Sequence, residues 1–117
     1  MIRAWRPEDR RFVVPTWARS WHRSPKRRDY ESIDRILNEP STRVLVLASD
    51  AASRTIHAWV AGTTDALHYV YVPMELRGNG VARDLITKLL GGYPDAIHIT
   101  RAWPFESTRF HLLRTAA

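Results

Sequence analysis

The sequence predicts an α/β fold of the α+β kind, in which a mixed sheet combines an antiparallel meander with one parallel pair of strands. Two observations lead to this prediction. Three short apolar strands, at residues 42–49, 55–62 and 66–73, follow one another with short connections, which favours antiparallel pairing. A helix at residues 81–90 then separates the third strand from another at residues 95–100, which makes this last pair parallel.

The segment before the meander predicts a short strand at residues 2–5 and two helices. The first helix starts in the segment RPEDRR, where Pro7 suits a first turn, but Pro15 lies inside its apolar pattern and indicates a kink or a later start. Asp29 is expected to cap the second helix, and Pro40 to end it. Both helices therefore precede the meander in the chain.

The composition limits the class of protein. The 117 residues suffice for one domain, 1–117, with a single core. The chain holds no cysteine, which excludes disulfides, thiolate nucleophiles and thiolate metal sites. No signal peptide and no apolar run of membrane-spanning length is apparent, so we expect a soluble, cytoplasmic protein without a membrane partner.

Residues 77–80, with the sequence RGNG, join the third strand of the meander to the following helix. Gly78 and Gly80 permit backbone angles that other residues avoid, and the N–H groups at a helix N-terminus favour an anion. The same glycines would also suit a tight turn without a ligand, so both interpretations stay open. Two familiar phosphate loops are excluded, because the third glycine of the dinucleotide motif and the lysine of the P-loop are missing.

The segment VYVPMELRGNGVARDLI resembles the acetyl-CoA motif of the GNAT N-acetyltransferase superfamily, in which a strand and a short bend lead to Arg/Gln-x-x-Gly-x-Gly/Ala at a helix start. Arg77, Gly80 and Ala82 occupy the three motif positions. The order strand, two helices, three-stranded meander, helix, strand is also the order of that fold, so the resemblance covers residues 1–101. The strand ALHYVYV resembles, more narrowly, small GNAT-like proteins of bacteriophages, which would place the protein in the host cytoplasm.

This resemblance implies an acyl-CoA-binding domain whose cofactor is acetyl-CoA and whose motif region is residues 66–101. It implies that the CoA pyrophosphate binds backbone N–H groups of six consecutive residues at the bend and the helix start: Arg77, Gly78, Asn79, Gly80, Val81 and Ala82. Tyr71 and Val72 would run beside the pantetheine arm, and the Val72 N–H would polarise the thioester carbonyl. The thioester would then lie where the two parallel strands splay apart.

Two histidines are candidates for proton transfer. His68 lies on the third strand of the meander, near where GNAT proteins often carry a general base, and the ordinary pKa of histidine suits that role. The alternative is a histidine packed between strands. His111 could replace the tyrosine with which the family commonly protonates the leaving thiolate, or it could be an incidental residue of a variable tail, 102–117. That tail is expected to be shortened, without the final hairpin of the family, and to hold at most a short helix at residues 107–113.

Two functions remain open at this point. The first is an acetyl-CoA-dependent N-acetyltransferase that transfers directly to an unidentified amine acceptor, either a small molecule or a protein, with a homodimer as one way to complete the acceptor side. The alternative is a non-catalytic basic module that binds nucleic acid or a host protein on a degraded GNAT scaffold, because the net charge of +6 attracts anions. We predict no metal site, although His57, His68 and His98 could gather on neighbouring strands.

Overall fold

The computed structural model describes residues 1–50 and 55–100 and the backbone of residues 110–112. Its strands form one sheet in the order in which they follow one another in the chain: β1 (Ile2–Ala4), β2 (Arg43–Ala48), β3 (Ile56–Gly62), β4 (Ala66–Tyr71), β5 (Ile97–Ile99) and β6 (Phe110–Leu112). Neighbours from β1 to β4 are antiparallel, whereas β4 and β5 are parallel. The predicted fold class, a meander joined to a parallel pair, is therefore confirmed.

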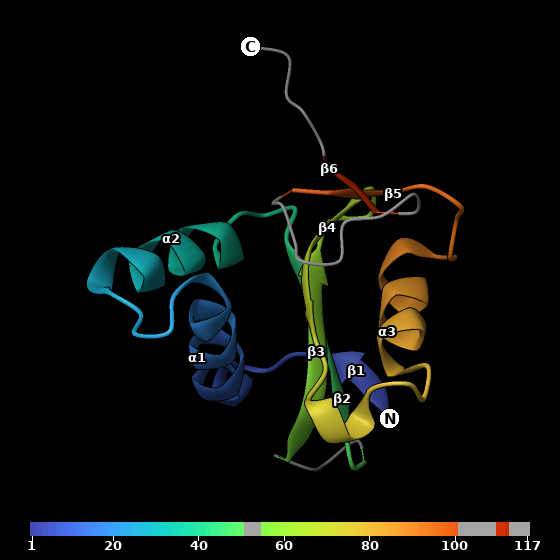
Figure 1. The fold of residues 1–117 in the computed structure, drawn as a ribbon, viewed down its shortest axis with the longest axis horizontal. Helices are drawn as coiled ribbons and strands as arrows, with labels where there is room; N and C mark the ends of the chain where they lie inside the picture. The colour runs from blue at the N-terminus through green and yellow to red at the C-terminus, as the bar shows by residue number, and fades with distance from the viewer. Residues whose placement is uncertain (51–54, 101–109, 113–117) are drawn as a thin grey trace.

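The helices cover both faces of the sheet. Figure 1 shows α1 (Arg10–Trp21) and α2 (Arg27–Leu37) on one side of the strands and α3 (Val81–Leu90) on the other. Two short 3-10 turns, η1 (Pro7–Asp9) and η2 (Met74–Leu76), precede α1 and α3. In the part of the chain that the structure describes, none of the helices has the length and apolar character needed to cross a membrane.

The alternation of side chains along β2 explains the three layers. Val44 and Val46 are buried in the cluster that α1 and α2 complete, whereas Leu45 between them is buried in the cluster of α3. Successive side chains of a strand point to opposite faces, so an apolar residue at every position requires a cover on both faces. The continuous apolar run of β2 thus dictates that the sheet lies between helices.

Two details of the first helices differ from the predictions. The helix α1 begins at Arg10, after the 3-10 turn that holds Pro7, and it continues through Pro15. Asp29 is not the cap residue of α2, because the helix already begins at Arg27. Its carboxylate instead accepts a hydrogen bond of 2.8 Å from the backbone N–H of Lys26, the residue before the helix. A carboxylate in the first turn can cap the helix backwards in this way, which residue type alone does not reveal.

The prediction of a helix at residues 107–113 is wrong for residues 110–112, the part of this segment whose backbone the structure describes. Phe110–Leu112 form the strand β6, which pairs in parallel with β5. The physical reason is that the outer edge of β5 presents N–H and C=O groups that require partners, and β6 supplies them. Over three residues, a strand pattern and a helix pattern cannot be distinguished by their periods.

The pairing of β4 with β5 is short. It joins Ala66 to His98 and Leu67 to Ile99, and the N–H of Thr100 then donates to the carbonyl of Leu67 at 3.0 Å. Beyond that point Tyr69–Tyr71 pair with β3 alone among the described strands. The far half of β4 therefore has an open edge, as expected for a splayed pair, and this edge positions the site described next.

Candidate active site

The bend between β4 and α3 has the backbone geometry of a glycine corner. Gly78 has a φ of 85° and Gly80 a φ of 77°, which are left-handed values that favour glycine. A Cβ atom at either position would meet no other atom within 4 Å. The glycines are therefore required by the backbone angles rather than by crowding, and the space above the bend is open to a ligand.

The helix α3 presents unsatisfied donors beside this bend. Its first intrahelical hydrogen bond runs from the N–H of Asp84 to the carbonyl of Gly80, at 3.0 Å, so the N–H groups of Val81, Ala82 and Arg83 precede it. Such groups carry the positive end of the helix dipole and favour an anion. The N–H of Arg77 differs from them, because it already donates to the carbonyl of Met74 at 3.2 Å.

Arginine side chains add full positive charge on both sides of the bend. Arg77 reaches back to the end of β4, where its Nε donates to the carbonyl of Val72 at 3.0 Å. This bond uses one of the five N–H donors of the guanidinium. Arg83 projects from the first turn of α3, and its guanidinium carbon lies 4.8 Å from the ring centroid of Tyr93. Both cations are thus held near the helix N-terminus.

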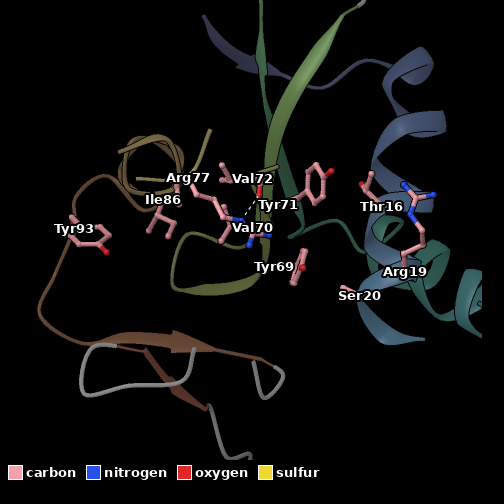
Figure 2. A pocket seen from close by; sticks show the side chains of 11 residues that line it. Thr16, Arg19, Ser20, Tyr69, Val70, Tyr71, Val72, Arg77, Ile86 and Tyr93 are labelled. Atoms are coloured by element: carbon pink, nitrogen blue, oxygen red, sulfur yellow. Dashed lines mark hydrogen bonds between the residues drawn. The ribbon is translucent and has the colours of Figure 1, made fainter. Parts of the chain in front are cut away.

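A pocket of about 570 Å³ extends along the open edge of β4 and has walls on both faces of the sheet. Its described lining comes from α1, from β4 and the residue after it, and from the bend, α3 and the segment beyond: Thr16, Arg19, Ser20, Tyr69, Val70, Tyr71, Val72, Arg77, Ala82, Ile86 and Tyr93. Figure 2 shows Tyr69 and Tyr71 directed towards α1, and Val70 and Val72 directed towards α3. The volume is in the range of pockets that bind small molecules and cofactors.

Packed aromatic rings hold the α1 wall in place. The ring of Trp17 stacks on that of Tyr69, with centroids 6.4 Å apart and planes inclined by 12°. The indole of Trp59 lies 5.6 Å from Tyr69 and donates its N–H to the hydroxyl of Thr16 at 2.8 Å. Trp17 and Trp59 are fully buried. These contacts make both tryptophans core residues, and they fix the position of α1 against β4.

The hydroxyl of Tyr69 keeps its proton over the physiological pH range. Partial burial raises the pKa of Tyr69 above its usual value, while a hydrogen bond with Ser20 and the positive charge of Arg77 act in the opposite direction. The raised pKa leaves the phenol neutral and able to donate a hydrogen bond inside the pocket.

The structure brings together some of the predicted site residues. Four of those assigned to the cofactor line the pocket: Tyr71, Val72, Arg77 and Ala82. The others, Gly78–Val81 in the sequence order of the bend and helix start, lie directly between them in the chain. Sequence reasoning had not assigned Arg19, Tyr69 or Tyr93 to the site. Only Tyr69 had a usable signal, because it alternates with Tyr71 and therefore lies on the same face of the strand.

Of the two candidate histidines, His68 is not part of the described lining of the pocket, and the side chain of His111 lies outside the part of the chain that the structure describes. The imidazole of His68 is 2.8 Å from the hydroxyl of Thr100, where β4 and β5 are still paired. Burial lowers the pKa of His68. His111 belongs to β6, where its backbone pairs with His98. Among the described residues, no group of histidine, aspartate and glutamate side chains could hold a metal ion.

Solved structures are similar to this chain in their fold. A ribosomal-protein-alanine N-acetyltransferase from Brucella melitensis biovar Abortus 2308 superposes with a TM-score of 0.56 and 20% sequence identity, over 78% of this chain and 70% of that one. An acetyltransferase from Vibrio fischeri superposes with a TM-score of 0.52 and 20% identity, over 75% of this chain and 81% of that one. The chain has the GNAT fold.

The likeness lies in the fold rather than in the sequence. No protein-family model matches the chain. No curated protein matches it either. The GNAT resemblance that the segment around RGNG suggests is thus supported at the level of the fold, by superpositions that cover 78% and 75% of this chain and compare the path of the backbone.

Proposed function

We propose that the protein is an acetyl-CoA-dependent N-acetyltransferase that acts by direct transfer. One observation carries the proposal: the open edge of β4 and the N-terminus of α3 meet in a single pocket. A strand edge supplies donors for a pantetheine arm and a carbonyl, and a helix N-terminus supplies donors for a phosphate. The GNAT fold of both acetyltransferases described above agrees with this assignment.

The bend fits the anionic part of acetyl-CoA. The N–H groups of Val81, Ala82 and Arg83, before the first intrahelical bond, would hold the pyrophosphate, with Arg77 adding charge. The open space above the glycines leaves room for its approach. The predicted contribution of the Arg77 N–H is not retained in this proposal, because that donor is bonded to Met74.

The strand edge fits the reacting part of the substrates. Alternate residues of a strand direct their N–H and C=O groups to opposite sides, so at least one of Tyr69–Tyr71 directs both groups to the open edge. Acetyl-CoA would supply the acetyl group as a thioester beside this edge and Val72. The amine nitrogen forms a bond to the acetyl carbon and gives up a proton, the carbon–sulfur bond breaks, and the sulfur leaves as a thiolate that takes up a proton.

Proton transfer is assigned as follows. Tyr69 is one of the hydroxyl-bearing residues that line the pocket, and its raised pKa keeps it protonated, so that it can donate to the developing charge. His68 and His111 stay predictions as base and acid, and each is tested by its own substitution: His68→Gln and His111→Gln should lower kcat only if the side chain moves a proton in the reaction. The measurement is the pH profile of kcat, which would lose its acid limb in His68→Gln if His68 is the base.

The decisive experiment is a calorimetric titration with acetyl-CoA. Gly80→Glu places a carboxylate where the pyrophosphate is expected and should weaken binding about 100-fold or more. Gly91→Glu is the matched control, because Gly91 has the same φ of 77° and open surroundings but lies at the other end of α3. It should keep the wild-type affinity.

Two outcomes would overturn the proposal: no binding by the wild-type protein, or equal losses in both variants. Absence of binding would favour the alternative of a basic binding module, for which a salt-dependent gel shift with nucleic acid is the test. If acetyl-CoA binds, the release of free thiol with a panel of amines measures turnover.

A further inference from the structure

The two sides of the pocket differ in how much positive charge would stay unneutralised once the proposed cofactor is bound. On the α3 side, Arg77 and the helix N-terminus would face the pyrophosphate of the proposed cofactor, which would neutralise their charge. On the α1 side, Arg19 lines the pocket and is exposed. No hydrogen bond or ion pair joins Arg19 to any other residue that the structure describes. Its charge is therefore available to a second ligand.

No described residue of the lining carries the negative charge that would pair with a positively charged acceptor. The eleven described lining residues include two arginines, Arg19 and Arg77, and no aspartate or glutamate. A polyamine or a lysine-rich peptide would bring further positive charge to this wall, which like charges disfavour. A carboxylate would instead pair with the guanidinium, whose planar fork matches its two oxygens.

Residues with hydroxyl and aromatic groups line the same pocket as Arg19. Ser20 follows it in α1, and Tyr69 lies across the gap on β4, as Figure 2 shows. Tyr71, on the same face of the strand, adds a second ring to this wall. The hydroxyl of Ser20 already donates to the carbonyl of Trp17 at 2.6 Å, so the guanidinium of Arg19 is the main donor for a carboxylate. Ring faces pack against an apolar or aromatic body. The α1 side thus offers one cation and flat apolar surface within a single pocket.

We propose that the α1 side of the pocket binds the acceptor, and that Arg19 pairs with a carboxylate carried by the amine that is acetylated. The acceptor class is an amino acid or a peptide end with an acidic group near its amine, with an aromatic amino acid as the simplest probe. This inference rests on the proposed function, since it assigns the second substrate of the same site. Arg19 acts in it as a specificity-determining residue.

The first experiment compares tyrosine with tyramine, which is the same molecule without the carboxylate. Thiol release is measured with acetyl-CoA, and rates are corrected to equal concentrations of neutral amine. The wild-type protein should prefer tyrosine by about tenfold or more in kcat/KM. In Arg19→Gln the KM for tyrosine should rise until that preference is lost, while the values for tyramine stay unchanged.

Arg23→Gln is the matched control, because Arg23 is an exposed arginine just beyond α1 that is not part of the described pocket lining. It should keep the preference for tyrosine. The inference is overturned if the wild-type protein uses tyramine as well as tyrosine, or if Arg19→Gln keeps the preference. It is also overturned if Arg19→Gln weakens acetyl-CoA binding and leaves the acceptor preference intact, since Arg19 would then serve the cofactor.

A binding experiment separates this inference from the proposed function. N-acetyltyrosine and N-acetyltyramine, the two products, are titrated into the protein without acetyl-CoA. N-acetyltyrosine should bind about tenfold more tightly, and Arg19→Gln should abolish the difference. Such a result would stand even if acetyl-CoA did not bind, whereas equal affinities or no binding of either product would refute the assignment of Arg19.

Discussion

The two walls of the pocket are built in different ways. The α3 wall comes from one continuous stretch, from Val72 through the bend to Ile86, and its main feature is backbone geometry at two glycines. The α1 wall comes from Thr16, Arg19 and Ser20, which reach β4 only because the chain folds back across the sheet. Local backbone preferences can therefore specify the first wall, whereas the second depends on packing between remote segments.

This difference has a consequence for the chemistry of each wall. A backbone site presents N–H groups that survive most side-chain changes, so a cofactor shared by many proteins is bound in this way. A wall of side chains can change with each substitution, so it suits the substrate that distinguishes one enzyme from another. The α3 wall should accordingly resist most side-chain substitutions outside its glycines, and the α1 wall should be sensitive to them.

The largest effect on stability should come from removing the indole ring of Trp17, which packs α1 against β4. Trp17→Ala deletes a fully buried side chain that contacts Trp21, Trp59 and Tyr69, and should cost about 3–5 kcal/mol of unfolding free energy. Urea denaturation followed by circular dichroism measures this loss. A cost below about 1 kcal/mol would mean that the packing of Trp17 does not hold the wall.

A smaller loss of unfolding free energy is expected when the buried hydrogen bond between Trp59 and Thr16 is removed. Thr16→Val keeps the shape of the side chain but leaves the indole N–H of Trp59 without its acceptor, which should cost about 1–3 kcal/mol. Thr16→Ser keeps the hydroxyl and is the matched control, with a smaller loss. In urea denaturation, a loss of stability in Thr16→Ser as large as that in Thr16→Val would contradict the prediction, because the methyl group would then contribute as much as the bond.

The backbone of the α3 wall should respond to a single methyl group. Gly78→Ala forces a residue with a side chain into a φ of 85°, which should cost about 1–2 kcal/mol even though the space around it is open. Gly92→Ala has equally open surroundings without a left-handed φ, and should change stability by less than about 0.5 kcal/mol. Thermal denaturation of both variants tests the contrast, which disappears if the two midpoints shift alike.

The smallest effect on stability should come from the titration of His68, which lies where β4 and β5 are paired. Burial lowers the pKa of His68 below its ordinary value of 6.5, so the unfolded chain binds that proton more readily than the folded protein. This contribution should be absent above pH 6.5 and should reduce stability as the pH falls below it. Urea denaturation between pH 7.5 and 5 should show a shallower decline in His68→Gln. An NMR titration that finds an imidazole pKa above 6.5 would contradict the prediction.

Much of the fold could be predicted because its signals are local. The strand patterns of β2 to β4 and the apolar stripe of α3 have different periods that can be read within ten residues, and Gly91 ends α3 with a φ of 77° as a glycine cap should. The parallel pairing of β5 followed from the helix before it, since a crossover connection requires it. Only β6 was missed, because three residues carry no distinguishable period.

The sequence by itself determined the α3 wall, the proposed cofactor side, because the strand, the RGNG bend and the start of α3 are neighbours in the chain and their backbone angles depend on nearby residue types. Only the tertiary structure decided the α1 wall, the proposed acceptor side. It brought Arg19 and Ser20 into one pocket with Tyr69 and ended the pairing of β4 with β5 after Leu67. Contacts between segments so far apart result from the packing of the whole core, and no local pattern of residues encodes them.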